Sequence, residues 1–347
     1  MKLFSGKSDF TISKTGLSSV ETIAINGVDQ KILIQTEDIQ NPILFMIHGG
    51  PSMPIPGVSN RGVDYALITC TKELVKRFTL VFWDQRGTGK SYSKKIPRES
   101  MRLQQFIQDA REVTNYLLKK FSQTKLHLMA HSWGTVIALS LAHQYPEKYY
   151  SYTAFSQITN WAENDKLCYK WLMNKLNEAN DQKGIRELNA VGEPPYLNGM
   201  DEWSIIRKYL MKYKSMFYDT GDRRSPTFAS AAKIMLGSPD YSLMDVFHTF
   251  TSGYKLSYTD QMLQDINTFD YFTEIPELEV PVLFIHGEKE AHVWPELALR
   301  YYEQLDAPFK KFFWSKKSSH AFHIDDAKEN EQTLLDYLPK LAAGLFD

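Results

Sequence analysis

One stretch of the chain, residues 125–139, limits more than any other the fold that the sequence can adopt. An apolar run leads into Ser132, and a run rich in alanine, leucine and valine follows it. This order predicts a strand, a one-residue elbow and a helix, which strains the serine backbone and exposes its hydroxyl at the end of a sheet. The positions two residues to each side need small side chains because strand and helix nearly touch there, and they hold Ala130 and Gly134. From this stretch alone, a serine that only caps the helix stays the alternative.

The other apolar runs predict an α/β fold with a largely parallel sheet and helices on both faces. Residues 20–36 alternate apolar and polar side chains around Asn26 and Gly27, which indicates a hairpin. Continuous apolar runs, typical of strands buried on both faces, then alternate with stretches of helical spacing. These runs cover residues 42–48, 79–83, 150–155, 280–286 and 309–314.

The stretch from residue 160 to residue 266 has a different character. Its spacing indicates helices with Trp, Tyr and Met on their apolar faces, and the pattern of a buried strand does not occur in it. Breaks are expected at Gly184, at residues 192–195, at Gly221 and at residues 237–239. We therefore expect a helical insertion within the α/β core.

The composition bounds the partners and the compartment. With 347 residues, 43% of them hydrophobic, and a net charge of −1, the chain has no charge excess for binding nucleic acid. No run approaches the roughly 18 apolar residues of a membrane span, and the N-terminus lacks the apolar core of a secretory signal. Cys70 and Cys168 lie far apart and are typical of unpaired thiols in a reducing compartment. We expect a cytoplasmic protein without cofactor, metal ion, nucleic-acid partner or membrane partner, and its oligomeric state is not readable from the sequence.

Candidates for a catalytic triad follow the predicted strands. A serine nucleophile needs a base and an orienting acid, and in sheets of this kind these groups lie on loops beyond the carboxyl ends of strands. The loop after the next-to-last predicted strand carries Glu288 and Glu290, and the loop after the last one carries His320 and His323. This is the chain order of nucleophile, acid and base that such folds use. We assign the base to His320, which lies closer to the strand end, and the acid to Glu290, with Glu288 as the alternative.

The negative charge of a tetrahedral intermediate needs fixed N–H donors. We expect the first from the backbone of Trp133, directly after the nucleophile, and the second from Gly50 in the turn after the first buried strand. Glycines at this turn let the backbone approach a substrate closely, so Gly49 is a further candidate for substrate contact. His48 is interpreted as a structural residue that hydrogen-bonds the turn.

Three motifs together resemble the α/β-hydrolase fold, and more narrowly its prolyl aminopeptidase-like (proline iminopeptidase-like) serine hydrolases. They are His48-Gly49-Gly50-Pro51, Asp84-Gln85-Arg86-Gly87-Thr88-Gly89-Lys90-Ser91 and His131-Ser132-Trp133-Gly134-Thr135. The resemblance implies an eight-stranded, mostly parallel sheet in a core of residues 1–155 and 268–347, with an all-helical cap of residues 156–267. Two positions depart from the family pattern, because Glu290 stands where the family generally has Asp and Ala130 where it has Gly.

The resemblance also implies a function. It implies a serine hydrolase that forms an acyl-enzyme and cleaves an N-terminal residue, proline-like or small and apolar, from short peptides. Prolyl aminopeptidases hold the substrate amine with acidic cap residues, for which Glu163, Glu193 and Glu202 are candidates here. A small-molecule carboxylesterase or amidase is the alternative. A catalytically weak hydrolase-fold protein that binds a ligand is a second alternative, which the departure at Glu290 keeps open.

Overall fold

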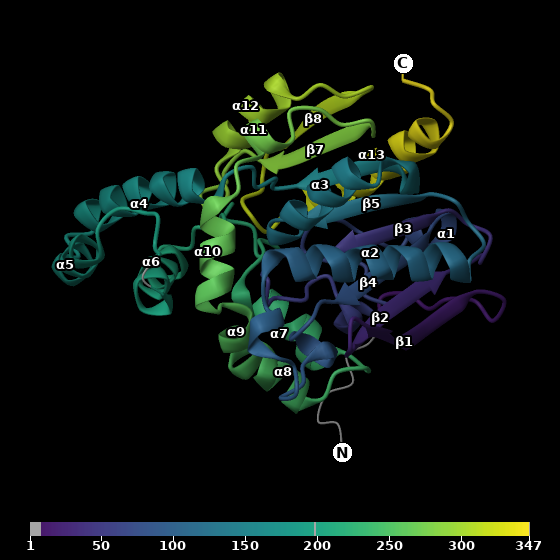
Figure 1. Cartoon of the computed structure of the whole chain (residues 1–347), viewed down its shortest axis with the longest axis horizontal. Helices are drawn as coiled ribbons and strands as arrows, with labels where there is room; N and C mark the ends of the chain where they lie inside the picture. The colour runs from purple at the N-terminus through teal and green to yellow at the C-terminus, as the bar shows by residue number, and fades with distance from the viewer. Residues whose placement is uncertain (1–7, 198, 347) are drawn as a thin grey trace.

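The computed structural model describes residues 8–197 and 199–346 and contains one eight-stranded sheet with the order β1-β2-β4-β3-β5-β6-β7-β8 (Figure 1). The strands are β1 (Leu17–Ile25), β2 (Val28–Thr36), β3 (Ile43–Ile47), β4 (Thr79–Asp84), β5 (Leu126–His131), β6 (Tyr149–Phe155), β7 (Val282–Gly287) and β8 (Lys310–Ser315). β2 pairs antiparallel with β1 and with β4, whereas every other neighbouring pair is parallel. The predicted mostly parallel sheet is confirmed.

Helices cover the sheet and fill the segment between β6 and β7. Those packed on the sheet are α1 (Leu74–Arg77), α2 (Leu103–Lys120), α3 (Trp133–Gln144), α12 (Pro295–Gln304) and α13 (Ile324–Ala342). Those between β6 and β7 are α4 (Trp161–Glu178), α5 (Gln182–Val191), α6 (Met200–Lys212), α7 (Phe228–Gly237), α8 (Leu243–Phe250), α9 (Ser252–Ser257), α10 (Asp260–Thr268) and α11 (Tyr271–Glu274). Short 3₁₀ turns occupy Val58–Asn60, Gly89–Ser91, Arg98–Ser100 and Pro146–Lys148.

The hairpin of β1 and β2 forms where the alternating pattern predicts it. Asn26 and Gly27 make the turn with φ values of 46° and 77°. Positive φ at both central residues matches the right-handed twist of the flanking strands, which is why Asn-Gly is favoured there. The register pairs Ile25 with Val28 across the turn.

The sheet separates two apolar cores because alternate side chains of a strand point to opposite faces. In β3, Phe45 packs in the core with α2 and α3, whereas Leu44 and Met46 pack in the core with α1 and α13. Figure 1 shows α2 and α3 lying across the near face of the sheet. Burial on both faces explains the continuous apolar run of this strand.

The segment between β6 and β7 is the helical insertion that the spacing predicts. Figure 1 shows α4, α5 and α6 projecting to one side of the sheet, with α7, α8 and α9 as a second group at the lower edge of the view. The expected break at Gly184 is wrong, because this glycine lies in the first turn of α5. A Cβ there would lie 2.2 Å from Leu176 of α4 and 2.8 Å from Tyr209 of α6, so the glycine permits close helix packing. Among the described residues, every helix is too short or too polar to cross a lipid bilayer.

Candidate active site

Ser132 forms the elbow between β5 and α3, with φ of 53° and ψ of −123°. Such a positive φ is a strained conformation for a residue with a side chain. Gly134 lets α3 return close to the sheet, since a Cβ there would lie only 2.2 Å from the carbonyl oxygen of Ile47 in β3. The requirement for a small residue after the serine therefore comes from the neighbouring strand. Ser132 remains 7% exposed at this turn.

Glu290 lies in the loop after β7, with both carboxylate oxygens bound to protein donors. Its Oε1 is 2.7 Å from Nδ1 of His320 and accepts a hydrogen bond from the N–H of Val293 at 3.0 Å. Its Oε2 accepts a hydrogen bond from the hydroxyl of Ser156 at 2.7 Å. Because an ionised carboxylate only accepts hydrogen bonds, Nδ1 of His320 is the donor of this pair and carries a proton.

The charge of this carboxyl is fixed by its neighbours. Burial alone would raise the pKa of Glu290, but the charge and hydrogen bond of His320 lower it, and His286 and Ser156 add to that effect. Together they bring the pKa of Glu290 down to about 2. The carboxyl is therefore ionised at neutral pH.

The alternative acid and base of the sequence analysis make other contacts. Glu288 is exposed, and its carboxylate lies 3.8 Å from Nζ of Lys289. His323 is the N-cap of α13, where its Nδ1 accepts a hydrogen bond from the N–H of Asp325 at 3.2 Å. The carboxylate–imidazole contact is thus formed by Glu290 with His320.

His131 links the elbow to the loop that carries His320. Its Nε2 lies 3.1 Å from the carbonyl oxygen of His320, and the two imidazole rings are 4.6 Å apart. Ser132 follows His131 directly, so the serine lies beside this loop. Ser132 and His320 both lie in the described part of the chain, and no direct hydrogen bond joins Oγ of Ser132 to the His320 ring. Catalytic hydrogen bonds often tighten only in the complex with substrate.

Gln85 ties the glycine turn to the elbow. Its Nε2 donates to the carbonyl oxygen of His48 at 2.8 Å, and its Oε1 accepts from the indole Nε1 of Trp133 at 3.0 Å. The N–H of Gln85 donates to Nε2 of His48 at 3.2 Å, which requires a neutral imidazole. Burial lowers the pKa of His48 to about 4, so this histidine serves the turn as a hydrogen-bonding residue.

The two expected oxyanion donors lie at the turn and at the start of α3. Trp133 is the first residue of α3, and its N–H therefore has no acceptor within the helix. Gly50 has a φ of +128°, which residues with a Cβ rarely adopt. A Cβ at Gly49 would lie 3.2 Å from Cβ of Ser132, so the turn packs directly against the elbow.

Sequence reasoning missed Gln85 and Ser156. Gln85 follows the last residue of β4, and Ser156 follows the last residue of β6. Polar residues at the carboxyl ends of buried strands on both sides of β3 and β5 are the signal that could have found them. The position after β6 carries a hydroxyl that supports the carboxylate of Glu290.

The glutamates expected to hold a substrate amine lie in the helical insertion. Glu163 of α4 pairs with Lys166 at 2.7 Å, and a little under half of each side chain is exposed. Glu193 is exposed and borders a surface pocket beside α4. Glu202 lies in the first turn of α6. The assignment of an amine-binding glutamate stays a prediction.

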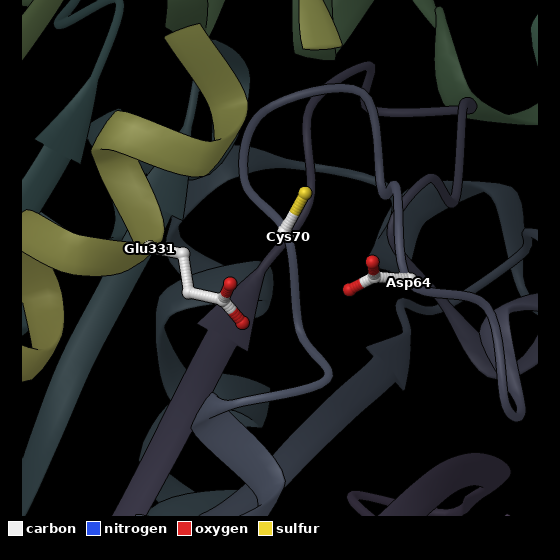
Figure 2. Close-up of side chains that lie close together, drawn as sticks. All are labelled: Asp64, Cys70 and Glu331. Atoms are coloured by element: carbon white, nitrogen blue, oxygen red, sulfur yellow. The ribbon is translucent and has the colours of Figure 1, made fainter. Parts of the chain in front are cut away.

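Two groups of described side chains bring potential metal ligands together. Figure 2 shows the first, in which Asp64, Cys70 and Glu331 converge. Oε1 of Glu331 accepts hydrogen bonds from two backbone N–H groups at the start of α1, at 2.8 and 3.3 Å. Oδ1 of Asp64 accepts from the N–H groups of residues 71 and 72 at 3.0 and 2.9 Å. Both carboxylates thus already bind backbone N–H groups of the segment that leads into α1.

The second group consists of Asp222, His323 and Asp325. Here Arg224 pairs with Asp222 at 2.6 Å and with Asp325 at 2.9 Å. Lys317 also pairs with Asp325 at 2.8 Å. Because side-chain cations already neutralise these carboxylates, the group has little attraction left for a metal ion.

The fold agrees with comparisons to known proteins. Residues 42–184 match the family model described as alpha/beta hydrolase fold. The chain is 30% identical over 322 residues to the probable aminopeptidase YbaC of Bacillus subtilis (strain 168). The aligned region covers 92% of this chain and 96% of that protein. The chain belongs to the α/β-hydrolase fold family.

This α/β hydrolase has further relatives with related names. It is 22% identical over 298 residues to a proline iminopeptidase of Heyndrickxia coagulans, across 85% of this chain and 90% of that protein. A solved structure of a proline iminopeptidase from Mycobacterium smegmatis superposes with a TM-score of 0.60 at 15% identity, covering 94% of this chain and 99% of that one. At that identity the likeness shows the fold alone. The family resemblance drawn from the motifs is confirmed.

Proposed function

We propose that this α/β hydrolase is a serine aminopeptidase that releases a proline-like or small apolar N-terminal residue from short peptides. Ser132 is the nucleophile, His320 the base and Glu290 the orienting acid. The observation that carries the proposal is the 2.7 Å contact between Nδ1 of His320 and Oε1 of Glu290, in loops packed against the serine elbow. The 30% identity to a probable aminopeptidase supports the substrate class.

In this mechanism, Nε2 of His320 takes the hydroxyl proton while Oγ of Ser132 attacks the carbonyl carbon of the first peptide bond. The ionised Glu290 stabilises the imidazolium, which then gives its proton to the leaving amine. A water molecule next attacks the acyl-enzyme, with His320 again as the base, and releases the N-terminal residue. The backbone N–H groups of Trp133 and Gly50 stabilise the oxyanion in both steps.

Gln85 and Ser156 act as positioning residues in this proposal. The hydroxyl of Ser156 fixes the second oxygen of Glu290, so that the first oxygen faces the imidazole. Gln85 bridges the carbonyl oxygen of His48 and the indole of Trp133. It therefore fixes the position of the glycine turn, with Gly50, relative to the start of α3, with Trp133. Removing either side chain should lower turnover more than it changes substrate binding.

Three substrate panels test the proposal. Purified protein is assayed with prolyl, alanyl and leucyl naphthylamides, with the N-acetylated forms of the same compounds, and with p-nitrophenyl esters of short acids. We expect cleavage of the naphthylamides with a free amine and none after acetylation. Turnover of esters without naphthylamide cleavage would contradict the aminopeptidase and leave a carboxylesterase. Absence of turnover in all panels would leave a catalytically weak binding protein.

A further inference from the structure

A buried ion pair lies in the helical insertion next to the candidate active site. Nη2 of Arg207, on α6, donates to both carboxylate oxygens of Asp165, on α4, at 2.6 and 2.8 Å. The Asp165 side chain is fully buried, whereas 11% of the Arg207 side chain is exposed. Arg207 is therefore the member of the pair that a ligand can reach.

Two indole rings hold the guanidinium in place. The guanidinium carbon of Arg207 lies 4.7 Å from the ring centre of Trp203 and 5.5 Å from that of Trp161. Aromatic faces stabilise a cation and restrict the orientation of its plane. The N–H groups on the edge of the guanidinium are thus presented in a fixed direction.

Two donors in this cluster have no acceptor. In the described part of the chain, Nε of Arg207 and Nε1 of Trp203 are buried without a hydrogen-bond partner. Trp203 is only 2% exposed. Burying an unpaired donor is unfavourable, and most buried polar groups in proteins have partners. An anionic group of a ligand could accept hydrogen bonds from these two donors and pair with the guanidinium of Arg207.

Side-chain contacts connect this cluster to the oxyanion turn and to the elbow. The ring of Tyr258 lies 4.3 Å from that of Trp203, and its hydroxyl donates to the carbonyl oxygen of Gly50 at 2.9 Å. The ring of Trp161 lies 6.3 Å from that of Trp133, the residue after the nucleophile candidate. Direct contacts of aromatic side chains thus connect the cluster to both parts of the site.

Resting on the aminopeptidase function proposed above, we propose that Arg207, together with Trp203, binds the free C-terminal carboxylate of a dipeptide or tripeptide substrate. A guanidinium matches a carboxylate through parallel N–H donors. A residue spans at most about 3.6 Å, so only in a very short peptide does this carboxylate lie close to the bond that Ser132 attacks. The ion pair with Asp165 then serves to position the guanidinium. The enzyme selects dipeptides and tripeptides over longer chains.

The test compares a substrate with and without the carboxylate charge. The values of kcat/KM are measured for prolylglycine and for prolylglycinamide, by quantifying the proline released. We expect the wild-type protein to prefer the acid by on the order of 10- to 100-fold, the usual effect of a hydrogen bond to a charged group. The same preference should shrink as glycines are added to the C-terminus.

Variants assign the preference to Arg207. Arg207→Gln is combined with Asp165→Asn, because the single change would leave a buried carboxylate unpaired. In the double variant, kcat/KM for prolylglycine should fall to parity with kcat/KM for prolylglycinamide, and this ratio within one variant does not depend on the overall activity of that variant. Lys208→Gln removes a cation from the next position of α6, where it pairs with Glu187, and should keep the preference.

The outcomes separate this inference from the proposed function. Equal cleavage of acid and amide by the wild-type protein would overturn the role of Arg207 and leave the aminopeptidase intact. A preference that survives in the double variant would overturn it as well. Failure to cleave prolylglycine, prolylglycinamide and the aminoacyl naphthylamides would contradict the proposed function together with the inference.

Discussion

Glu290 shows how a longer carboxylate can be held at a position where similar hydrolases generally carry aspartate. One oxygen faces Nδ1 of His320 and the N–H of Val293, and the other accepts from Ser156. Three donors fix the additional methylene group in one conformation. The carboxylate therefore meets the imidazole at hydrogen-bond distance without a shorter side chain.

Replacement of this acid tests its orienting role at the scale of one residue. Glu290→Gln keeps the shape of the side chain but offers the imidazole the wrong hydrogen-bond pattern, so kcat should fall by on the order of 10⁴-fold. Glu288→Gln should leave kcat within a few-fold of wild type, because Glu288 is exposed and pairs with Lys289. Both variants are compared with an aminoacyl naphthylamide under saturating conditions. A larger loss in Glu288→Gln would move the acid to that residue.

Replacement by alanine also distinguishes the roles of His320 and His323, the two histidines of the last loop. His320→Ala should lower kcat by about 10⁴- to 10⁶-fold. His323→Ala should instead lower the free energy of unfolding by about 1 kcal/mol, because it removes the N-cap of α13. Turnover and thermal unfolding are measured on both variants. If His323→Ala abolishes turnover and His320→Ala does not, the base has been assigned to the wrong ring.

At the scale of elements, the crossing of α3 over β3 sets the elbow. Gly134→Ala would place a Cβ 2.2 Å from the carbonyl oxygen of Ile47 and 2.7 Å from that of His48. We expect a loss of about 1–3 kcal/mol in the free energy of unfolding, as for other overpacked sites, together with a large loss of turnover. Ala130→Gly is the control on the strand side and should cost about 0.5–1 kcal/mol. Denaturant unfolding checks both, and equal, small losses would contradict the close approach.

The elements and the site differ in how far the sequence predicts them. Strands such as β3 are readable because burial on both faces demands a continuous apolar run. Of the proposed triad, Ser132 and Glu290 are readable because each follows directly or closely on a buried strand, and His320 is readable because it follows the half-buried edge strand β8. The role proposed for Arg207 was not readable from the sequence. Its contact with Asp165 arises where α4 packs on α6, and sequence spacing does not encode helix–helix contacts.

At the scale of the whole molecule, buried histidines make the fold sensitive to acid. Burial lowers the pKa of His48 and His286 to about 4 and that of His127 and His131 to about 3. Burial also lowers the pKa of His292 well below its ordinary value. In the unfolded chain these imidazoles titrate near 6.5, so below that pH the unfolded state binds more protons and stability falls. Burial raises the pKa of the carboxyl of Asp84 to about 7, which opposes this effect with one proton.

Denaturant unfolding at a series of pH values tests this sensitivity. Five buried imidazoles opposed by one carboxyl leave a net excess of four protons in the unfolded state, so the free energy of unfolding should fall by roughly 5 kcal/mol per pH unit near pH 5. His127→Gln removes one of the buried imidazoles away from the catalytic loops and should reduce the slope by about one proton. A free energy of unfolding that stays constant between pH 6.5 and 5 would contradict the neutral burial of these rings.

The relay of Ser132, His320 and Glu290 is tested most directly by the intact mass of the folded protein after reaction with a fluorophosphonate. We predict one adduct, mapped to Ser132, that is absent in Ser132→Ala and forms orders of magnitude more slowly in His320→Ala. No adduct on the folded wild-type protein, or an adduct that persists in Ser132→Ala, would contradict the relay.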